Sequence, residues 1–584
     1  EDDGETAAMN KLQEAIRRVS VEEADEIFPF VATLMGMKLS GKHAERVKGI
    51  EGEALEKLIF KNVRELLIRS TEIIPVVIVI EDLHWADTSS LLLIDALYRL
   101  ARSQKVVFIN VFRPGYWDSA DKNPGNLKDR MTDLLPVELV LQPLDSQSSE
   151  SLINNMLNIK GLHHGVKTRI IERAGGNPFF IEEVVRGLID EGAVVVKDGV
   201  FEVTDKINSV VIPPTINDVL MARIDRLDEE SRNVVKVASV IGRSFFYRIL
   251  ADVITRVESL DDKLEYLKQI QLIRERIQMN ELEYLFKHAL AQEAAYESTL
   301  LQQRKQLHLK VAESIERLFS ERLHEFYGIL AMHYSRADNL EKAEEYIEKA
   351  GEEALRSSAS SEAIIYFLQA LQFYTGKQGQ TADPEKMAGF EKNLALAYHS
   401  RGQFREAVYY IDKVLTRWGR RPPGNRVSRM VKCAIDLLTI LMRLYLPWTG
   451  RKKIADKRVN DYFDLAKLKF RDMLFFDQET LATDSIALIR ESFRYNPTSL
   501  DFAAESHITL GTMFAFAGWL RLVDRVLDVS PKVVEEQNIG YLTHQMGITA
   551  IYLCSGKWAE IPEYDKLLLK AGAEKGFFWD MGAY

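Results

Sequence analysis

The sequence predicts a multidomain protein of mixed α/β and all-α parts, in which an α/β domain comes first and helices follow. Residues 75–87, PVVIVIEDLHWAD, contain five consecutive β-branched residues, which is typical of a buried strand in a parallel sheet. Apolar residues recur at helical spacing beyond residue 145, and from about 301 the helices recur as pairs. A chain of 584 residues is too long for one core, so about three or four domains are expected.

The first predicted strand ends in two acids, Glu81 and Asp82. Open α/β sheets bind their ligands at the carboxyl ends of the strands. Carboxylates beside a low-dielectric core are costly unless a cation or a reacting group lies near them. Two interpretations follow from the residues alone: the acids solvate the end of the strand, or they face a nucleotide-bound Mg²⁺.

Further strands are predicted for the same sheet. Residues 105–113, KVVFINVFR, form a second β-branched and aromatic run, which ends in Arg113. A third, shorter strand is expected at 137–141. Asp87 or Thr88 is expected to cap the helix that continues through LLLIDALYRLA, which is a structural role. From the residues alone, Arg113 is a surface arginine at a strand end.

The segment EDLHWAD, followed by TSS and LLLIDALYRLA, resembles the extended Walker B segment of the STAND class of P-loop ATPases. Within that class it is most similar to the ATPase–TPR portion of bacterial multidomain adenylate or guanylate cyclases and of some serine/threonine kinases. The resemblance implies an AAA-like P-loop sheet that binds ATP or ADP with Mg²⁺. It places Glu81 on the Mg²⁺ side and makes Asp82 the base that polarises the attacking water, so both acids are candidate catalytic residues and metal ligands. Arg113 matches the sensor that contacts the γ-phosphate.

The Walker A loop of that class, a Gly-rich turn ending in Gly-Lys-Ser/Thr, has no convincing counterpart. Residues 36–43, GMKLSGKH, imitate its spacing but place His43 where the Mg²⁺-binding hydroxyl belongs. The preceding residues suggest a helix interrupted by Pro29 rather than a strand, so the segment is interpreted as a linker between two helices. Because the sequence begins at Glu1 without Met, we expect the P-loop to precede it. Residues 1–144 are therefore predicted to be a partial nucleotide-binding domain that lacks Walker A. The 584-residue chain by itself is expected to be inactive as an ATPase, with the activity expected in the intact protein.

Residues 145–212 are predicted to form a helical bundle, with helices at 145–159 and 166–192. GGNP at 175–178 interrupts the second helix, since it combines a helix stop, an extended residue before proline and a new helix start. In the resembled class Pro178 matches a proline that packs against the adenine. A plain turn between helices explains the same residues equally well.

Residues 213–300 are predicted to form a winged helix, with helices at about 217–227, 229–241, 244–254 and 258–273 and a wing that turns at Met279-Asn280. The last helix carries four acids against two lysines and would repel DNA phosphates, which favours a role facing the nucleotide. His288 follows the wing in FKHALAQEAAY. By the resemblance it reaches the β-phosphate, and an imidazole can donate to phosphate. The alternative is a histidine that only stands near a helix start.

Residues 301–584 are predicted to form an α-solenoid of TPR-like helix pairs, which offers a concave face to a protein partner. Small and aromatic residues repeat at the offsets of such pairs: Ala331, Tyr334, Ala343, Ile347 and Ala350, then Ala395, Tyr398, Gly402, Ala407 and Ile411, then Gly511, Phe514 and Gly518, then Thr549, Tyr552 and Gly556.

Composition limits the classes of function. The net charge of −10 argues against a nucleic-acid-binding protein. Cys433 and Cys554 form no disulfide or metal pattern, and no signal peptide is present, so a cytoplasmic location is expected. The apolar stretch 433–448 contains Asp436 and Arg443, so we expect no membrane span. It is interpreted as a buried repeat helix, with an interfacial membrane contact as the alternative.

Together these features predict an ATP-binding and ATP-hydrolysing signal-transduction regulator. Its nucleotide state and its TPR partner would control a fused or associated effector, first a class III adenylate or guanylate cyclase and second a protein kinase. Arg113, Pro178 and His288 lie far apart in sequence, so they could share a nucleotide only if the domains fold over it. A nucleotide-dependent oligomer is a further expectation. The alternatives are a non-catalytic TPR scaffold with a degenerate ATPase half and a transcriptional activator of the same class.

Overall fold

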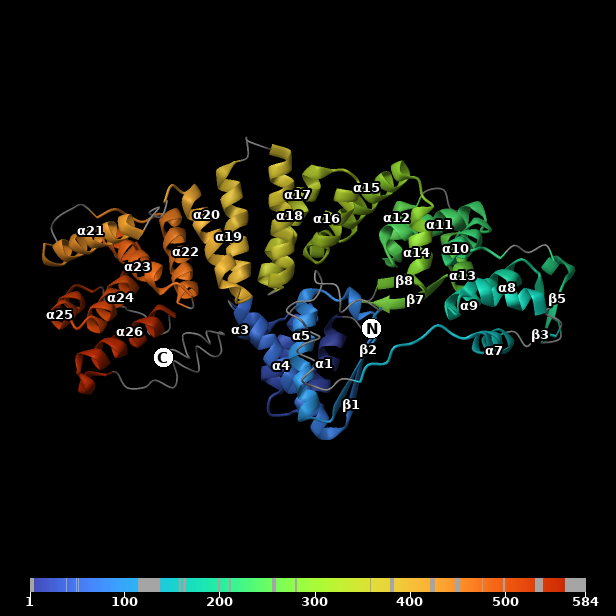
Figure 1. Ribbon diagram of the computed structural model, residues 1–584, viewed down its shortest axis with the longest axis horizontal. Coiled ribbons are helices and arrows are strands. Elements are labelled where there is room, and N and C mark those ends of the chain that lie inside the picture. The colour runs from blue at the N-terminus through green and yellow to red at the C-terminus, as the bar shows by residue number, and fades with distance from the viewer. Residues whose placement is uncertain are drawn as a thin grey trace. The chain divides into compact units, whose positions relative to one another are not determined.

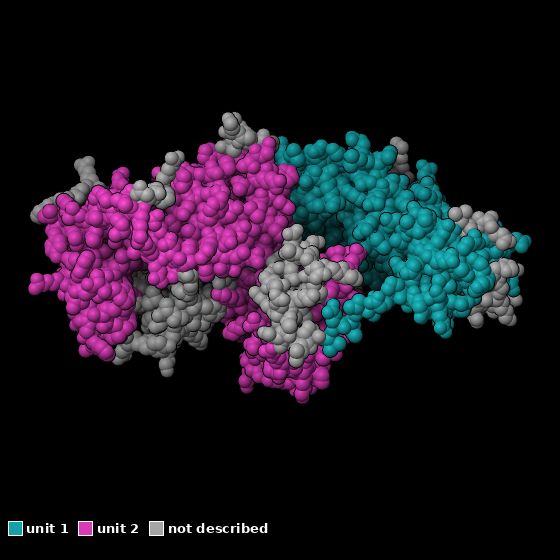
Figure 2. Space-filling view, in the orientation of Figure 1, with its two compact units in different colours: residues 1–8, 135–346 teal, residues 9–134, 347–584 magenta. Residues whose placement is uncertain are grey.

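The protein is described by a computed structural model, and its contacts divide the chain into two compact units (Figure 2). Unit 1 contains residues 1–8 and 135–346, and unit 2 contains residues 9–134 and 347–584. The structure describes residues 5–561 except 38, 49, 51, 114–136, 157–158, 161–163, 198–199, 209–211, 255–258, 279–280, 358, 379–382, 421–425, 447–451, 475, 497–498, 501 and 531–538.

The chain begins with α1 (Glu5–Val19), of which residues 9–19 belong to unit 2. Helices α2 (Ala24–Leu34), α3 (Gly41–Val47) and α4 (Gly52–Ile73) follow in that unit. Helix α2 continues through Pro29, where the sequence had suggested an interruption. Proline removes one backbone hydrogen bond from a helix. Here Ile27, Phe28 and Phe30 are almost completely buried in the cores around α2, and this packing keeps the helix continuous.

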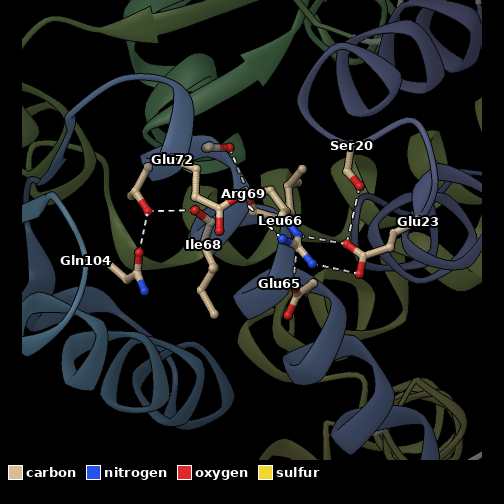
Figure 3. Close-up of polar contacts among 10 residues, drawn as sticks. Ser20, Glu23, Glu65, Leu66, Ile68, Arg69, Glu72 and Gln104 are labelled. Carbon is tan, nitrogen blue, oxygen red and sulfur yellow. Dashed lines mark hydrogen bonds and ion pairs between the residues drawn. The ribbon is translucent and has the colours of Figure 1, made fainter.

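A polar network joins these helices ahead of the sheet (Figure 3). The Arg69 guanidinium on α4 donates to both carboxylate oxygens of Glu23, each at 3.0 Å, and also pairs with Glu65. The Thr71 hydroxyl lies 3.0 Å from the Gln104 side-chain oxygen, just before the second strand. The network fixes the end of α4, which leads directly into the first strand.

The two strands predicted around the acidic segment form a parallel pair (Figure 1). Strand β1 (Val76–Ile80) is in register with β2 (Val106–Asn110), from Val76 opposite Val106 to Ile80 opposite Asn110. Helix α5 (Thr88–Tyr98) follows β1, and its Leu91 packs with Leu83 beside the sheet. The predicted third strand is absent: residues 137–141 have no regular structure, and Leu141 is exposed. A strand needs a neighbour for its backbone groups, and this segment pairs with none in the described part of the chain.

Unit 1 begins with α7 (Ser146–Met156), α8 (His164–Ala174) and α9 (Pro178–Asp190). The predicted bundle was incomplete, because a small sheet accompanies these helices. Strands β4 (Val194–Lys197) and β5 (Val200–Val203) pair antiparallel, and β3 (Ile159–Lys160) pairs with β5. The sequence carried a hairpin signal here, since Asp-Gly at 198–199 stands between two β-branched runs. That dipeptide lies outside the described residues.

The next part of unit 1 contains α10 (Ile216–Asp225), α11 (Glu229–Ile241), α12 (Tyr247–Val253), α13 (Leu260–Gln269) and α14 (Ala289–Glu297). Strands β7 (Ile273–Gln278) and β8 (Glu281–Phe286) form the predicted hairpin, and its turn at 279–280 lies outside the described residues. The expected helix at 244–254 starts later, because Ser244–Phe246 is strand β6 and pairs with β8. Phe245 is buried there against Tyr284, so packing on the sheet overrides helix formation.

Helix pairs occupy the remainder of both units (Figure 1). The helices are α15 (Leu301–Leu318), α16 (Tyr327–Arg336), α17 (Leu340–Arg356), α18 (Ser360–Gln378), α19 (Pro384–Ser400), α20 (Phe404–Arg417), α21 (Arg426–Tyr445), α22 (Lys457–Met473), α23 (Gln478–Ser492), α24 (Ala503–Phe516), α25 (Leu520–Val529) and α26 (Ile539–Ser555). The predicted repeat positions behave as expected. Ala343, Ala395 and Ala407 are completely buried, and Gly402 and Gly518 take positive φ angles at the turns.

Helix α21 differs from the buried repeat helix that the sequence suggested. Ile440 and Leu444 are buried in the core, whereas Ile435, Leu438 and Met442 on the same helix are exposed. Within the described residues, no helix combines the length and the apolar character needed to cross a bilayer.

Candidate functional site

The structure brings Glu81, Asp82 and the segment before Arg113 to one edge of the sheet in unit 2. Because β1 and β2 are parallel and in register, both chains leave the sheet at the same edge. The Val111 N–H donates to the Ile80 carbonyl at 2.8 Å, and the Leu83 N–H donates to the Val111 carbonyl at 3.0 Å. These bonds fix the turn that carries the acids beside the end of β2. Glu81, Asp82 and Arg113 are all exposed there.

The turn after β1 has an unusual backbone. Asp82 adopts the left-handed conformation, with φ 55° and ψ 34°, which is uncommon for a residue other than glycine. Such a conformation persists only where the surrounding structure holds it, and residues of this kind cluster at functional sites. The Asp82 side chain therefore leaves the strand in a direction that an ordinary strand ending would not give.

The residues after Asp82 play mainly structural roles. Leu83 is buried against Leu91 and Tyr98, so it fixes the short helix Leu83–Trp85 under the edge. The Arg113 guanidinium lies over the Trp85 ring, 5.9 Å from its centroid, which favours a fixed place for this arginine. Of the two caps expected for α5, Asp87 and Thr88, the structure shows Asp87. Its carboxylate accepts a hydrogen bond from the Ser90 N–H at 2.7 Å.

The acids at this edge fit part of a Mg²⁺ site. Mg²⁺ in phosphate-binding sites is held by one or two carboxylates, and phosphates and water fill the other positions. Glu81 and Asp82 supply two adjacent carboxylates, and the described residues contain no cluster of three or more metal-binding side chains. The protein would thus supply one or two carboxylate ligands, which is as few as a nucleotide-bound Mg²⁺ requires.

In unit 1 the GGNP segment forms a tight corner before α9. Gly176 has φ +78°, and its carbonyl accepts from the Leu144 N–H at 2.9 Å. The Asn177 side chain caps α9 by accepting from the Phe179 N–H at 3.0 Å, and Pro178 is the first residue of the helix. Proline is favoured at this position because its missing N–H has no helical partner. Pro178 is exposed at the corner.

The structure places His288 at this same corner. Its imidazole packs against the Phe179 ring, with 4.1 Å between the ring centroids and 40° between the ring planes, so it lies next to the residue that follows Pro178. His288 precedes α14, but its side chain does not cap that helix. Within the described residues its Nε2 atom is buried and has no hydrogen-bond partner. Burial lowers the pKa of His288, Glu183 opposes the shift, and Lys287 adds to it.

Phe179 was not among the residues predicted from the sequence. It joins Pro178 to His288, which lie 110 positions apart in sequence. Glu183 was missed as well. It is buried on α9, and its carboxylate accepts from Arg223 at 2.6 Å. The sequence shows two phenylalanines after GGNP and an acid one helical turn later. It does not show that His288 contacts them.

The segment that imitates a P-loop links two helices, and its last three residues, 41–43, are the first residues of the second helix. Helix α2 precedes it, α3 begins at Gly41, and no strand leads into it. Lys42 pairs with Asp25 at 2.6 Å, and His43 packs its edge against Phe28. Lys38 lies outside the described residues.

Comparisons with known proteins give limited matches. Residues 145–202 match a domain of unknown function, DUF8739. An uncharacterized protein of Rhizobium meliloti (strain 1021) is 25% identical over 344 residues, which is 55% of this chain but only 31% of that protein's length. The crystal structure of a STAND protein with a tetratricopeptide repeat sensor from Pyrococcus horikoshii is 14% identical, with coverage of 95% of this chain and 89% of that chain. Its TM-score of 0.32 is too low to support a shared fold.

Proposed function

We propose that this chain is the regulatory part of a STAND-class ATPase in the cytoplasm, which binds ATP or ADP with Mg²⁺. The observation that carries the proposal is the convergence of Glu81, Asp82 and the chain leading to Arg113 at one edge of a parallel sheet. Glu81 would hold the metal's water shell, Asp82 would orient the attacking water, and Arg113 would contact the γ-phosphate. Bound Mg²⁺ would neutralise charge on the phosphates.

In unit 1 the corner at Pro178 would contribute to nucleotide binding as well. Pro178 and Phe179 offer apolar surface of the kind that packs against a base. His288 offers a buried ring nitrogen that lacks a partner in the described residues, and a phosphate oxygen would supply one. The arrangement of α10–α14 with the β6–β8–β7 sheet, a winged helix in this proposal, holds that histidine in place.

The helix pairs would recognise a protein partner and transmit binding to an effector, with a class III nucleotide cyclase as the first expectation. Release of the nucleotide would activate the effector, which is inactive while the nucleotide is bound.

Calorimetry with ATP and Mg²⁺ tests the histidine. His288→Ala should weaken ATP binding about tenfold or more, because one hydrogen bond to a charged phosphate is lost. His324→Ala, an exposed histidine in the same unit, is the matched control and should bind like the parent. ATP affinity of the parent should also rise as the pH falls, because a bound phosphate raises the pKa of His288. An equal affinity in both variants would remove His288 from the site.

ATP turnover tests the acids, and it is measured on protein from the complete reading frame. Asp82→Asn should retain ATP binding but lower turnover by about 10²-fold or more, because an amide cannot act as a base toward water. The control is Asp87→Asn, since asparagine caps a helix nearly as well as aspartate. Unchanged turnover in Asp82→Asn would contradict the assigned role.

A further inference from the structure

Helices α21 and α23 of unit 2 enclose a cluster of arginines that the proposed function does not use. At its centre is Glu491, whose side chain is 5% exposed. Its carboxylate lies 3.0 Å from Arg494, 3.4 Å from Arg420 and 3.6 Å from Arg490. Three guanidiniums therefore share one buried carboxylate.

A second carboxylate only partly balances this charge. Asp436 on α21 pairs with Arg490, with 2.9 Å between Oδ1 and Nε, and is also 5% exposed. Arg443 lies two helical turns after Asp436 on α21 and adds a fourth guanidinium. The charged neighbours of Arg443 are Arg494, Arg490 and Glu491. The cluster thus contains four arginines and only two carboxylates.

Within the described part of the chain, Arg443 forms no ion pair, whereas the other three arginines of the cluster do. Its Nη1 atom is buried and has no hydrogen-bond partner among the residues that the structure describes. Burial lowers the pKa of Arg443, Arg494 and Arg490 lower it further, and Glu491 opposes them. Part of the Arg443 guanidinium is therefore withdrawn from water without a partner, which is unfavourable for a charged group, so the arrangement favours an added anion.

We propose that this cluster is an anion-binding site in which Arg443, Arg490 and Arg494 receive the phosphate group of a small molecule. A dianionic phosphate matches the excess of two positive charges, whereas a single carboxylate would balance only one. Planar guanidiniums bind phosphate oxygens in paired hydrogen bonds. The bound phosphate would tie α21 to α23 in the solenoid.

Two lysines next to Arg494 in the structure add positive charge near the cluster. The Lys453 N–H donates to the Arg494 carbonyl at 2.8 Å, and the Asn496 N–H donates to the Lys453 carbonyl at 2.7 Å. This bridge holds the exposed Lys452 and Lys453 beside Arg494. Exposed lysines near an arginine cluster raise the local concentration of anions and speed their association.

Calorimetry and thermal unfolding test the site, with inorganic phosphate as the probe and sodium chloride at equal ionic strength as the reference. The parent chain should bind phosphate saturably and melt at a higher temperature in phosphate than in chloride. Arg443→Met should raise the Kd for phosphate at least about tenfold. In chloride this variant should be at least as stable as the parent, because an uncompensated charge has been removed.

Arg426→Met is the matched control, because Arg426 lies on the same helix but pairs with the exposed Glu479. It should keep the full response to phosphate. Glycerol 3-phosphate distinguishes the sources: binding of both probes indicates a phosphate monoester, and binding of inorganic phosphate alone indicates the free ion. Absence of saturable binding to the parent would overturn the proposal without any variant, and so would an equal Kd in Arg443→Met.

Discussion

Gly176 shows how a single residue fixes the corner that carries Pro178. Its φ of +78° is strained for any residue with a side chain. A Cβ atom at this position would lie 2.3 Å from the Leu144 carbonyl oxygen, which is far inside contact distance. The neighbouring Gly175 also has a positive φ, +52°, but no atom lies within 4 Å of its Cβ position.

The two glycines therefore make a matched pair of substitutions. Gly175→Ala should lower the free energy of unfolding by about 1 kcal/mol, the cost of the left-handed conformation. Gly176→Ala should lower it by about 3 kcal/mol or more, because the clash with backbone is added. Urea unfolding followed by circular dichroism measures both. Equal losses would mean that the corner relaxes away from Leu144.

A second prediction at this scale concerns a buried histidine pair in unit 1. His308 and His333 are fully buried, with 2.8 Å between their Nδ1 atoms, and the Tyr296 hydroxyl lies 3.1 Å from His308 Nε2. Burial lowers the pKa of both imidazoles. Arg336 and Arg304 lower the pKa of His308 further, and His308 and Arg336 lower that of His333. Each ring is thus neutral in the folded protein under conditions where the unfolded chain would bind a proton.

Because the folded pKa is lowered, the stability that the pair contributes is present above the unfolded value of 6.5 and is lost as the pH falls below it. When the pH falls from 8 to 5, each histidine should lower the free energy of unfolding by about 2 kcal/mol. His333→Leu should therefore lessen this acid loss by about 2 kcal/mol, as measured by urea unfolding at the two pH values. His324→Leu, which changes an exposed histidine, should not. The same acid loss in all three proteins would contradict the assignment.

At the scale of elements, one buried lysine joins three helices of the solenoid. Lys469 on α22 has a side chain that is 9% exposed, and its Nζ lies 2.8 Å from Asp412 on α20 and 2.8 Å from Asp484 on α23. Removal of one partner from a buried ion pair leaves charges that have lost both water and their counterion. The packing of these helices thus depends on a polar contact as well as on their apolar faces.

Lys469→Met should destabilise this part of the chain by about 1.5–3 kcal/mol, because two partly exposed aspartates are left without their shared cation. Lys467→Met is the control on the same helix. Lys467 pairs with Glu505 nearer the surface, so the loss should stay below about 1 kcal/mol. Guanidinium or urea unfolding gives both values. A small loss in Lys469→Met would show that solvent reaches the aspartates readily.

For the whole molecule, the division into two compact units predicts more than one unfolding transition. Gly176 lies in unit 1 and Lys469 lies in unit 2, so the two destabilising substitutions mark different units. Scanning calorimetry of Gly176→Ala should shift one transition to lower temperature, and Lys469→Met should shift another. A single transition that moves in both variants would mean that the units unfold cooperatively.

The sequence by itself determined the local features of this protein. The β-branched runs at 76–80 and 106–110 became paired strands, the small residues Ala343, Ala395 and Ala407 became buried contacts between helices, and Asp87 capped α5. These outcomes depend on neighbouring residues or on a short period, so the pattern contains the needed information. The two acids were placed directly after the first strand, and β1 ends at Ile80, one residue before Glu81.

The tertiary structure alone decided which distant residues meet. It made 244–246 a strand, left 137–141 without a partner strand among the described residues, and packed His288 against Phe179. It also gathered Arg420, Arg443, Arg490 and Arg494 around two carboxylates. Pairing of strands, burial of charge and the environment of an imidazole depend on segments far apart in the chain, whose contacts no local propensity encodes.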